Sequence, residues 1–247
     1  MDLGLKDRTA IVCGSSSGLG LATAEALASE GANVAMFARR RDVLEREADR
    51  IGALAVRGDA TSTRDLERLV DQTVAAFRGI DILVWNGGGP PPGRAEDLTV
   101  EAVERAVELL LLPPILLLRL CLPYLERSPG GRVIAITSTA VLEPTPHLAL
   151  SNVVRPGVTG WAKSLSRELG PRGITVNCVA PGRIATTRLD QLYPGGPTEE
   201  ALAEIPLRRW GAPPELGDVV CFLASERARY VSGQTIAVDG GLTRGLL

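Results

Sequence analysis

The chain has 247 residues, of which 45% are hydrophobic and 23% charged, and its formal net charge is −2. This composition is typical of a soluble α/β protein, and we expect a single domain over residues 1–247. The near-neutral charge argues against nucleic acid or a membrane surface as a partner.

The N-terminus and the cysteines indicate a cytoplasmic protein. The first residues lead directly into a strand pattern, without the charged and apolar segments of a signal peptide. The four cysteines are scattered with no CxxC pair, which favours reduced, buried thiols over a disulfide framework or a metal site. An apolar run over 109–125 is interrupted by Pro113, Pro114 and Arg119, well short of the ~20 residues of a membrane span. We expect it to be a buried helix or a subunit contact.

Short β-branched runs alternate with amphipathic segments along the chain. The pattern predicts strands at 9–14, 33–38, 53–59, 80–86, 131–138, 173–182 and 234–241. It predicts helices at 19–30, 42–51 and 65–77, two helical segments before the fifth strand, a helix within 147–169 and one near 214–224. Parallel strands need such helix-length connections, so we expect a doubly wound parallel α/β sheet.

The sequence CGSSSGLG, residues 13–20, lies where the first predicted strand meets the first predicted helix. Glycines in the spacing G-x-x-x-G-x-G let the backbone approach a pyrophosphate at a helix N-terminus. The residues expected to bind a dinucleotide here are Gly14, Ser16, Ser17, Gly18, Leu19 and Gly20. The alternative is a tight strand-to-helix turn without a ligand.

The ends of the next two strands indicate which dinucleotide is preferred. Ala38 is followed by three arginines, whereas an acid at this position would select the 2′-hydroxyl of NAD. Arginine suits a 2′-phosphate, so Arg39, helped by Arg40, favours NADP(H) over NAD(H); a solvated basic face is the alternative. Asp59, next to Ala60, could accept a hydrogen bond from the adenine amino group or cap a helix.

Together these motifs resemble the short-chain dehydrogenase/reductase family over essentially the whole chain. CGSSSGLG resembles the family's TGxxxGxG loop, and WNGGG (85–89) stands where the family has NNAG. VNCVAPGRIAT (176–186) resembles VNxxxPGxxxT, and VSGQTIAVDGG (231–241) the C-terminal signature. The resemblance, nearest to the 3-oxoacyl-[acyl-carrier-protein] reductase branch, implies a Rossmann-type sheet of about seven strands in the order 3-2-1-4-5-6-7. It also implies hydride transfer between nicotinamide and a carbonyl or secondary alcohol, and a homo-oligomer, often a tetramer.

The resemblance assigns further cofactor contacts by position. Asn86, Gly87 and Gly88 would border the adenosine ribose, with Trp85 in place of the motif's first asparagine. Pro181 and Gly182 would lie beside the cofactor, and Ile184 and Thr186 would hold the nicotinamide carboxamide. The loop NGGGPPPG and a substrate loop over about 184–210 would line the substrate pocket.

The family's catalytic set is altered in this chain. Ser138 matches the family serine after the fifth strand, but Ser151 and Arg155 stand in the positions of the Tyr-x-x-x-Lys motif. Leu110 stands at about the position of the relay asparagine. A serine hydroxyl is far less acidic than a phenol, and arginine is a permanent cation. Arg155 could still bind the nicotinamide ribose, whereas the proton donor is open among water, Ser151 and His147.

Pro156 affects the predicted geometry of this helix. Proline disfavours helical backbone before it and is tolerated in a first turn. The helix is therefore expected to begin with Ser151 or Asn152 as its N-cap, or to be kinked at Pro156. If Ser151 caps the helix, Arg155 would be partly solvated.

The resulting hypothesis is an NADP(H)-dependent oxidoreductase with a non-standard site. The alternatives are a catalytically impaired dinucleotide-binding sensor or partner subunit, and a purely structural subunit.

Overall fold

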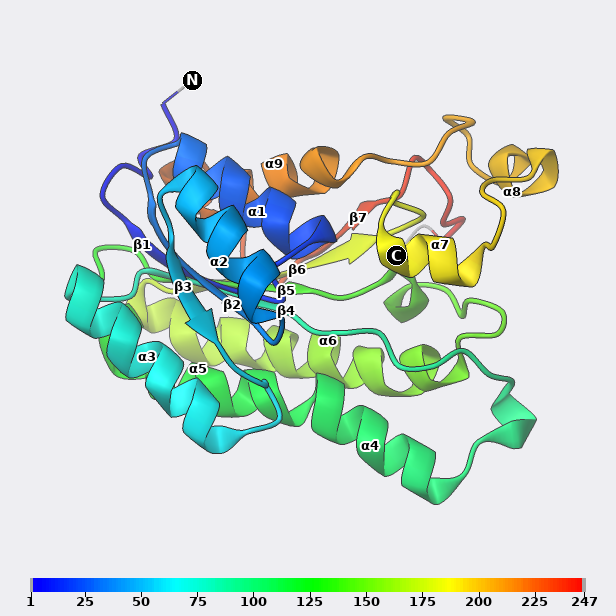
Figure 1. Cartoon of the computed structure of the whole chain (residues 1–247), viewed down its shortest axis with the longest axis horizontal. Coiled ribbons are helices and arrows are strands. Elements are labelled where there is room, and N and C mark those ends of the chain that lie inside the picture. The colour runs from blue at the N-terminus through cyan, green and yellow to red at the C-terminus, as the bar shows by residue number, and fades with distance from the viewer. Residues whose placement is uncertain (1, 246–247) are drawn as a thin grey trace.

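The computed structural model describes residues 2–245 and has one parallel sheet of seven strands at its centre (Figure 1). The strand order is β3-β2-β1-β4-β5-β6-β7, as predicted. The strands are β1 (Thr9–Cys13), β2 (Asn33–Ala38), β3 (Leu54–Arg57), β4 (Ile82–Asn86), β5 (Arg132–Ile136), β6 (Thr175–Pro181) and β7 (Thr235–Val238). The expected domain range of 1–247 also includes Met1 and residues 246–247, which lie outside the described part.

The central strands are mostly apolar because helices cover both faces of the sheet. Every residue of β1, β5 and β6 is buried, the pattern of a parallel sheet packed on both sides. Successive side chains of β1 alternate between the faces, so Ile11 lies in one core cluster and Val12 in the other. The strand order reverses between β1 and β4, which places a crevice outside the carboxyl ends of these strands.

The helices form one layer on each face (Figure 1). One layer contains α1 (Gly18–Ser29), α2 (Arg41–Ile51) and α9 (Pro213–Ala224). The other contains α3 (Thr63–Phe77), α4 (Val100–Leu110), α5 (Leu112–Leu125) and α6 (Ala149–Leu169). Short 3₁₀ turns occupy Ala95–Asp97, Thr139–Val141, Gly170–Arg172 and Glu226–Ala228.

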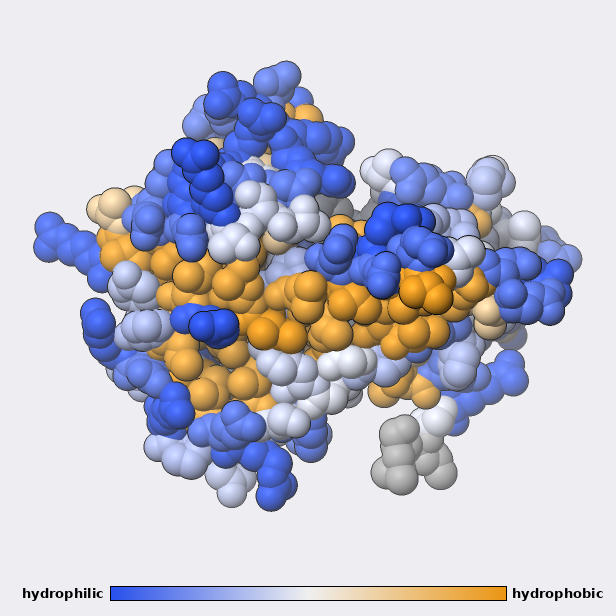
Figure 2. All heavy atoms as spheres, turned by 90° about the horizontal axis from the view of Figure 1, so that it is seen from below, coloured by the Kyte–Doolittle hydropathy of each residue, from blue (hydrophilic) through white to orange (hydrophobic). Residues whose placement is uncertain are grey.

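The apolar run over 109–125 forms the last two residues of α4 and all of α5. By length and composition alone, Val100–Leu125 could cross a membrane, but buried core helices pass the same test. Here Leu117 and Leu125 of α5 are fully buried in the core beneath the sheet. Seen from below, a broad band of hydrophobic residues also reaches the surface on this side of the molecule (Figure 2).

The structure corrects the predicted start of α6. The helix begins at Ala149 after Leu148, so Ser151 lies inside it and does not cap it. Leu150 and Val154 pack on Ala106 and Leu110 of α4, and this apolar contact stabilises the first turn against the local preference of the sequence. Pro156 therefore lies in the helix interior.

The predicted substrate loop over about 184–210 also contains regular secondary structure. It contains two short helices, α7 (Thr187–Leu192) and α8 (Glu199–Ala203). Thr186 and Thr198 are their N-caps, with side chains that accept hydrogen bonds from Leu189 N and Ala201 N. A short helix with a threonine cap lacks the long apolar period that identifies a helix in sequence.

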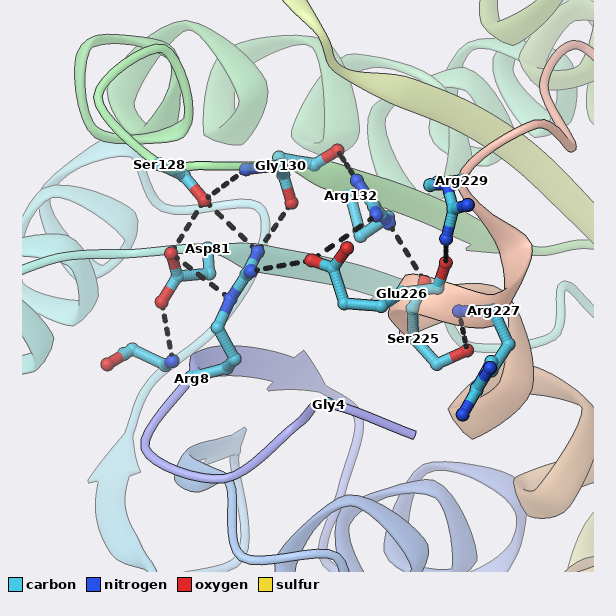
Figure 3. Close-up of polar contacts among 12 residues, drawn as sticks. Gly4, Arg8, Asp81, Ser128, Gly130, Arg132, Ser225, Glu226, Arg227 and Arg229 are labelled. Carbon is cyan, nitrogen blue, oxygen red and sulfur yellow. Dashed lines mark hydrogen bonds and ion pairs between the residues drawn. The ribbon is translucent and has the colours of Figure 1, made fainter. Parts of the chain in front are cut away.

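A polar network closes the opposite edge of the sheet (Figure 3). The Arg8 guanidinium lies 3.4 Å from an Asp81 carboxylate oxygen and 3.3 Å from Glu226, and it donates to Ser128 Oγ at 3.1 Å. Asp81 precedes β4 and Glu226 follows α9. The network thus ties the chain's N-terminal segment to the amino ends of the central strands, away from the crevice.

Candidate active site

A cavity of about 650 Å³ lies at the carboxyl ends of β4, β5 and β6. All four predicted catalytic residues line it: Ser138, His147, Ser151 and Arg155. Ten of the predicted cofactor residues other than Arg155 line it as well: Ser17, Gly18, Leu19, Asn86, Gly87, Gly88, Pro181, Gly182, Ile184 and Thr186. The structure therefore brings the glycine loop and the altered catalytic set to one site.

The glycine loop is a close-packed backbone cradle. Gly14 and Gly18 have φ values of +60° and +58°, which L side chains rarely adopt. A Cβ on Gly20 would lie 2.3 Å from the Gly14 carbonyl oxygen, so no side chain fits there. Asn86 Nδ2 donates to the same carbonyl at 3.3 Å and links the loop to β4.

The first turn of α1 has the features of a phosphate site. Ser17 is the N-cap, but its side chain makes no capping bond, so the helix's first N–H groups are free for another acceptor. Together with the cradle, which a Cβ would fill, this arrangement fits a dinucleotide pyrophosphate.

Ser15 is a structural residue of this loop that the sequence analysis missed. Its side chain is fully buried; Oγ donates to Val12 O at 2.9 Å and accepts from Phe37 N at 3.0 Å. It thereby fixes the loop against β2. Nothing distinguishes Ser15 from the neighbouring serines in sequence, because the difference is one of burial.

The arginines after β2 divide between two places. Arg40 donates to Ser17 Oγ at 2.9 Å and to Ser16 Oγ at 3.4 Å, so its guanidinium group contacts the glycine loop. Arg39 instead lines a second cavity of about 720 Å³, with Arg41, Arg57 and Arg68. The sequence favours Arg39 for the leading role at a 2′-phosphate, whereas Arg40 is the one that contacts the glycine loop in the structure.

Asp59 lies in the same second cavity, with Ala60 directly after it. Its Oδ1 accepts hydrogen bonds from Thr61 N at 3.0 Å and Thr61 Oγ1 at 2.8 Å. Ser62 is the N-cap of α3, and its side chain accepts from Asp65 N. The alternative that Asp59 caps this helix is therefore wrong.

Ser151 and Arg155 contact one another on one face of α6. Arg155 Nε donates to Ser151 Oγ at 3.1 Å, and the two η nitrogens donate to Thr137 O at 2.9 Å and Gly88 O at 3.1 Å. Burial, helped by the charge of Arg188, lowers the pKa of Arg155 to about 10. The residue is still a cation at neutral pH. Three protein acceptors hold its guanidinium group, and the residue as a whole is half-buried, so it is partly exposed to solvent although Ser151 does not cap the helix.

Ser138 and His147 face the cavity from two loops. Ser138 follows β5, and its Oγ accepts a hydrogen bond from Ala140 N at 3.2 Å, which leaves its own proton available for another acceptor. His147 has a φ of +59°, a strained backbone for this residue type. Its carbonyl accepts from Gly93 N at 2.8 Å, so the loop over 87–93 holds the histidine at the entrance to α6.

The remaining family positions are apolar. Leu110 is buried against Leu150 and Val154, with no polar group to relay a proton. Trp85 is buried in the core, and a Cβ on Gly87 would lie 3.0 Å from its ring.

Tyr193 lines the cavity, with its ring 5.9 Å from that of Trp210.

Two arginines of the cavity were not predicted as site residues. Arg183 and Arg188 both line it, the first beside the Tyr193 ring at 5.3 Å and the second bonded to Pro90 O at 2.5 Å. In sequence they are two of 25 arginines, and only the folded loop shows that they face the catalytic candidates.

Comparison with known proteins agrees with this geometry. A family model described as Enoyl-(Acyl carrier protein) reductase matches residues 14–243. Human dehydrogenase/reductase SDR family member 4 is 34% identical over 244 residues, covering 96% of this chain and 88% of that protein. The 3-oxoacyl-[acyl-carrier-protein] reductase of Synechocystis sp. is 34% identical over 245 residues, covering 96% and 98%.

Solved structures are similar over the whole chain. L-sorbose reductase from Gluconobacter frateurii, complexed with NADPH and L-sorbose, has a TM-score of 0.92 at 30% identity and covers 100% of both chains. A short chain oxidoreductase from Pseudomonas aeruginosa PAO1, NADPH-bound and with an atypical catalytic center, has a TM-score of 0.92 at 28% identity over 98% and 99% of the chains. The chain therefore belongs to the short-chain dehydrogenase/reductase family of oxidoreductases.

Proposed function

We propose that this protein is an NADP(H)-dependent oxidoreductase that reduces a ketone, such as a 3-oxoacyl group, or oxidises the matching secondary alcohol, with a non-standard site. The observation that carries the proposal is the cavity that joins the glycine cradle to Ser138, Ser151 and Arg155. A crevice at the switch point of a doubly wound sheet is the usual dinucleotide site.

The preference for NADP(H) rests on the end of β2. Ala38 replaces the acid that would hold a 2′-hydroxyl, and Arg40 lies on the serines of the glycine loop. Arg39 follows Ala38 and is exposed. Two solved relatives were obtained with NADPH, which supports the same assignment here.

When bound, the nicotinamide supplies or accepts the hydride. The Ser138 hydroxyl is free to donate to the substrate oxygen, because its own Oγ only accepts within the described chain. The fixed Arg155 cation stabilises negative charge that develops nearby, as preorganised charge does in a site shielded from water. Its N–H groups beyond those bonded to Ser151, Thr137 and Gly88 can bind the ribose hydroxyls.

The proton donor differs from the family tyrosine. Ser151 Oγ accepts from Arg155 Nε, so its hydroxyl proton points elsewhere and the adjacent cation favours its release. His147 lines the same cavity, and an imidazole is a competent acid near neutral pH. Water is the third candidate. We therefore expect slower turnover than a Tyr–Lys pair gives, since a positioned proton donor contributes about 10²- to 10⁴-fold.

A second candidate function has one observation in its favour. The glycine cradle is complete, whereas the tyrosine, lysine and asparagine positions hold Ser151, Arg155 and buried Leu110. A dinucleotide-binding sensor or partner subunit would retain the cradle and lose the proton relay.

Fluorescence titration separates these functions first. We expect NADPH to bind more tightly than NADH, followed by NADPH oxidation with at least one member of a panel of ketones, 3-oxoacyl thioesters and quinones. Tight binding without oxidation across the panel would favour the sensor. If neither nucleotide binds, both functions are wrong and a structural role is favoured.

Where turnover is found, two variants test the site. Ser138→Ala and His147→Ala should each lower kcat. If His147 is the proton donor, His147→Ala should lower kcat by about 10²-fold or more. Ser164→Ala is the matched control, because Ser164 is an exposed serine of α6 outside the cavity. Unchanged rates for both site variants would refute the assignment.

A further inference from the structure

The cavity carries an excess of positive charge. Among the described residues that line it are Arg155, Arg183 and Arg188, but no aspartate or glutamate. Arg183 is ion-paired with Glu204 outside the lining. No carboxylate of the described chain lies within ion-pair distance of Arg155 or Arg188. Two guanidinium groups thus face a cavity in which no carboxylate neutralises them.

The two cations are held by neighbouring residues of one loop. Arg155 Nη2 donates to Gly88 O at 3.1 Å, and Arg188 Nη2 donates to Pro90 O at 2.5 Å. A Cβ built on Gly89, between them, would lie 2.6 Å from Arg188 Nε. Residues from α6 and α7 therefore bring like charges to the same short stretch of backbone.

This placement is unfavourable without an anion. The acceptors of Arg155 and Arg188 are a hydroxyl and backbone carbonyls, which satisfy hydrogen bonds but leave the net charge. Burial lowers the pKa of both guanidinium groups, and the charge of Arg188 lowers that of Arg155 further. Partial burial of two like charges without a counter-charge is costly, so a negatively charged group in the cavity would stabilise both.

The cofactor's own phosphates have other places in this fold. The pyrophosphate fits the glycine cradle at the first turn of α1, and the 2′-phosphate fits Arg39 and Arg40 after β2. Arg188 instead donates to Pro90 O, in the loop over 87–93. The same loop holds His147, because Gly93 N donates to the His147 carbonyl. Among the described residues Arg188 donates only through Nη2, so its Nε and Nη1 groups remain available to a ligand in the cavity that Arg188 lines.

We propose that Arg188, with the neighbouring charge of Arg155, binds a carboxylate of the substrate, so that this protein acts on oxo acids or the corresponding hydroxy acids. The inference rests on the proposed function and names its substrate class. The free N–H groups of Arg188 bind the carboxylate oxygens, a charge-assisted and geometrically specific contact. Arg155 attracts the same group while it positions the ribose. A cavity of about 650 Å³ is large enough for a small acid beside a nicotinamide.

The test compares acids with their neutral esters. The probes are acetoacetate and levulinate against methyl acetoacetate and methyl levulinate, with NADPH. We expect wild-type kcat/KM to be about ten- to a hundredfold higher for each acid than for its ester. Arg188→Gln should abolish this preference, mainly by raising KM for the acid, so that kcat/KM becomes similar for acid and ester, and should leave the NADPH Kd unchanged. Arg188→Lys should restore part of the preference, and Arg229→Gln, an exposed arginine of the opposite edge, should change nothing.

Three outcomes overturn the inference. Equal kcat/KM for acids and esters in the wild type would refute it while the proposed function stands. A weaker NADPH Kd in Arg188→Gln, with the acid preference intact, would assign Arg188 to the cofactor. If no probe is turned over, calorimetric titration of acetoacetate and levulinate into the protein with NADP⁺ decides. Binding that Arg188→Gln abolishes would support the site although catalysis fails, and no binding of either acid would reject it.

Discussion

The pair Ser151 and Arg155 stands, by the family resemblance, in the positions of the Tyr-x-x-x-Lys motif, and we propose that it keeps the position of that motif without its proton-transfer chemistry. Both side chains lie on the face of α6 that lines the cavity, four residues apart. A lysine at position 155 could exchange a proton, whereas Arg155 remains charged because its pKa, although lowered by burial, is about 10. We therefore expect Arg155 to contribute charge and positioning, and another group to transfer the proton.

The arginines after β2 allow the cofactor preference to be tested residue by residue. Arg40→Ala should weaken NADPH binding about tenfold or more while NADH binding changes little, because a 2′-phosphate contact is charge-assisted. Arg39→Ala should also weaken NADPH binding more than NADH binding. We expect a smaller loss than for Arg40→Ala, because Arg39 lines the second cavity whereas Arg40 contacts the glycine loop. Fluorescence titration at low and high salt measures both, since exposed charge interactions are screened by salt. Equal losses for NADPH and NADH would contradict the 2′-phosphate assignment.

Glu215 gives a pH-dependent contribution to stability. Hydrogen bonds from Arg209, and then from Ala212 N, lower the pKa of this carboxyl to about 2. The unfolded chain binds the proton at a higher pH than the folded one, so the stabilisation is complete above about pH 5 and is lost as the pH falls towards 2. Glu215→Gln should therefore unfold more easily than wild type near pH 7, by a difference that shrinks towards about pH 2.5. Urea melts at both pH values measure it, with Glu67→Gln, an exposed residue of α3, as control; a difference that does not depend on pH would count against this account.

At the scale of elements, the predicted strands match because each has a strong local signal. β1, β5 and β6 are buried and mostly apolar runs, interrupted by single polar residues such as Arg132 and Asn177, and glycine or proline lies at one end of each. The start of α6 was predicted wrongly because Ser151 and Pro156 look like helix-start residues, while the contact of Leu150 with Leu110 acts at a distance in sequence. α7 and α8 were missed because they are too short for a helical period.

The candidate site was predictable to the extent that it depends on backbone shape. The spacing of Gly14, Gly18 and Gly20 already requires a cradle, and the structure shows the close contact that excludes a side chain at Gly20. Arg188 could not be identified in this way, because its partner Pro90 lies 98 residues earlier in the chain. Charge excess in a cavity is a property of the folded chain and leaves no local pattern.

Two glycines inside helices provide a matched test of the cradle. In Gly20→Ala the new methyl would lie 2.3 Å from Gly14 O, so the loop must move. We expect NADPH binding to be lost and the free energy of unfolding to fall by about 1–3 kcal/mol. In Gly160→Ala, in α6, the new methyl meets nothing within 4 Å. This variant should raise the free energy of unfolding by about 0.5–1 kcal/mol. Urea melts and NADPH titration of both variants measure these effects; normal NADPH binding by Gly20→Ala would show that the cradle is not the cofactor site.

At the scale of the whole molecule, the two edges of the sheet have different tasks. The carboxyl edge carries the cavity, where Arg155 and Arg188 leave positive charge uncompensated. At the amino edge, Arg8 meets Asp81 and Glu226, so the cation there has carboxylate partners (Figure 3). The same residue type thus stabilises the fold at one edge and, we propose, binds ligand at the other.

The hydrophobic band on the side of α4, α5 and α6 (Figure 2) leads to a prediction about assembly. Val100 of α4, Leu112 of α5 and Val153 of α6 are 69%, 51% and 53% exposed, although burial of such a side chain is worth about 1.5–3 kcal/mol. We expect a second copy to cover this face, so that light scattering after gel filtration gives a multiple of 26.1 kDa. Leu112→Glu should shift the protein towards the monomer, because the charge would be buried in the contact. Tyr230→Glu, at a fully exposed side chain outside these helices, should leave the mass unchanged. A wild-type monomer at micromolar concentration, or equal masses for wild type and Leu112→Glu, would show that this face is not the subunit contact.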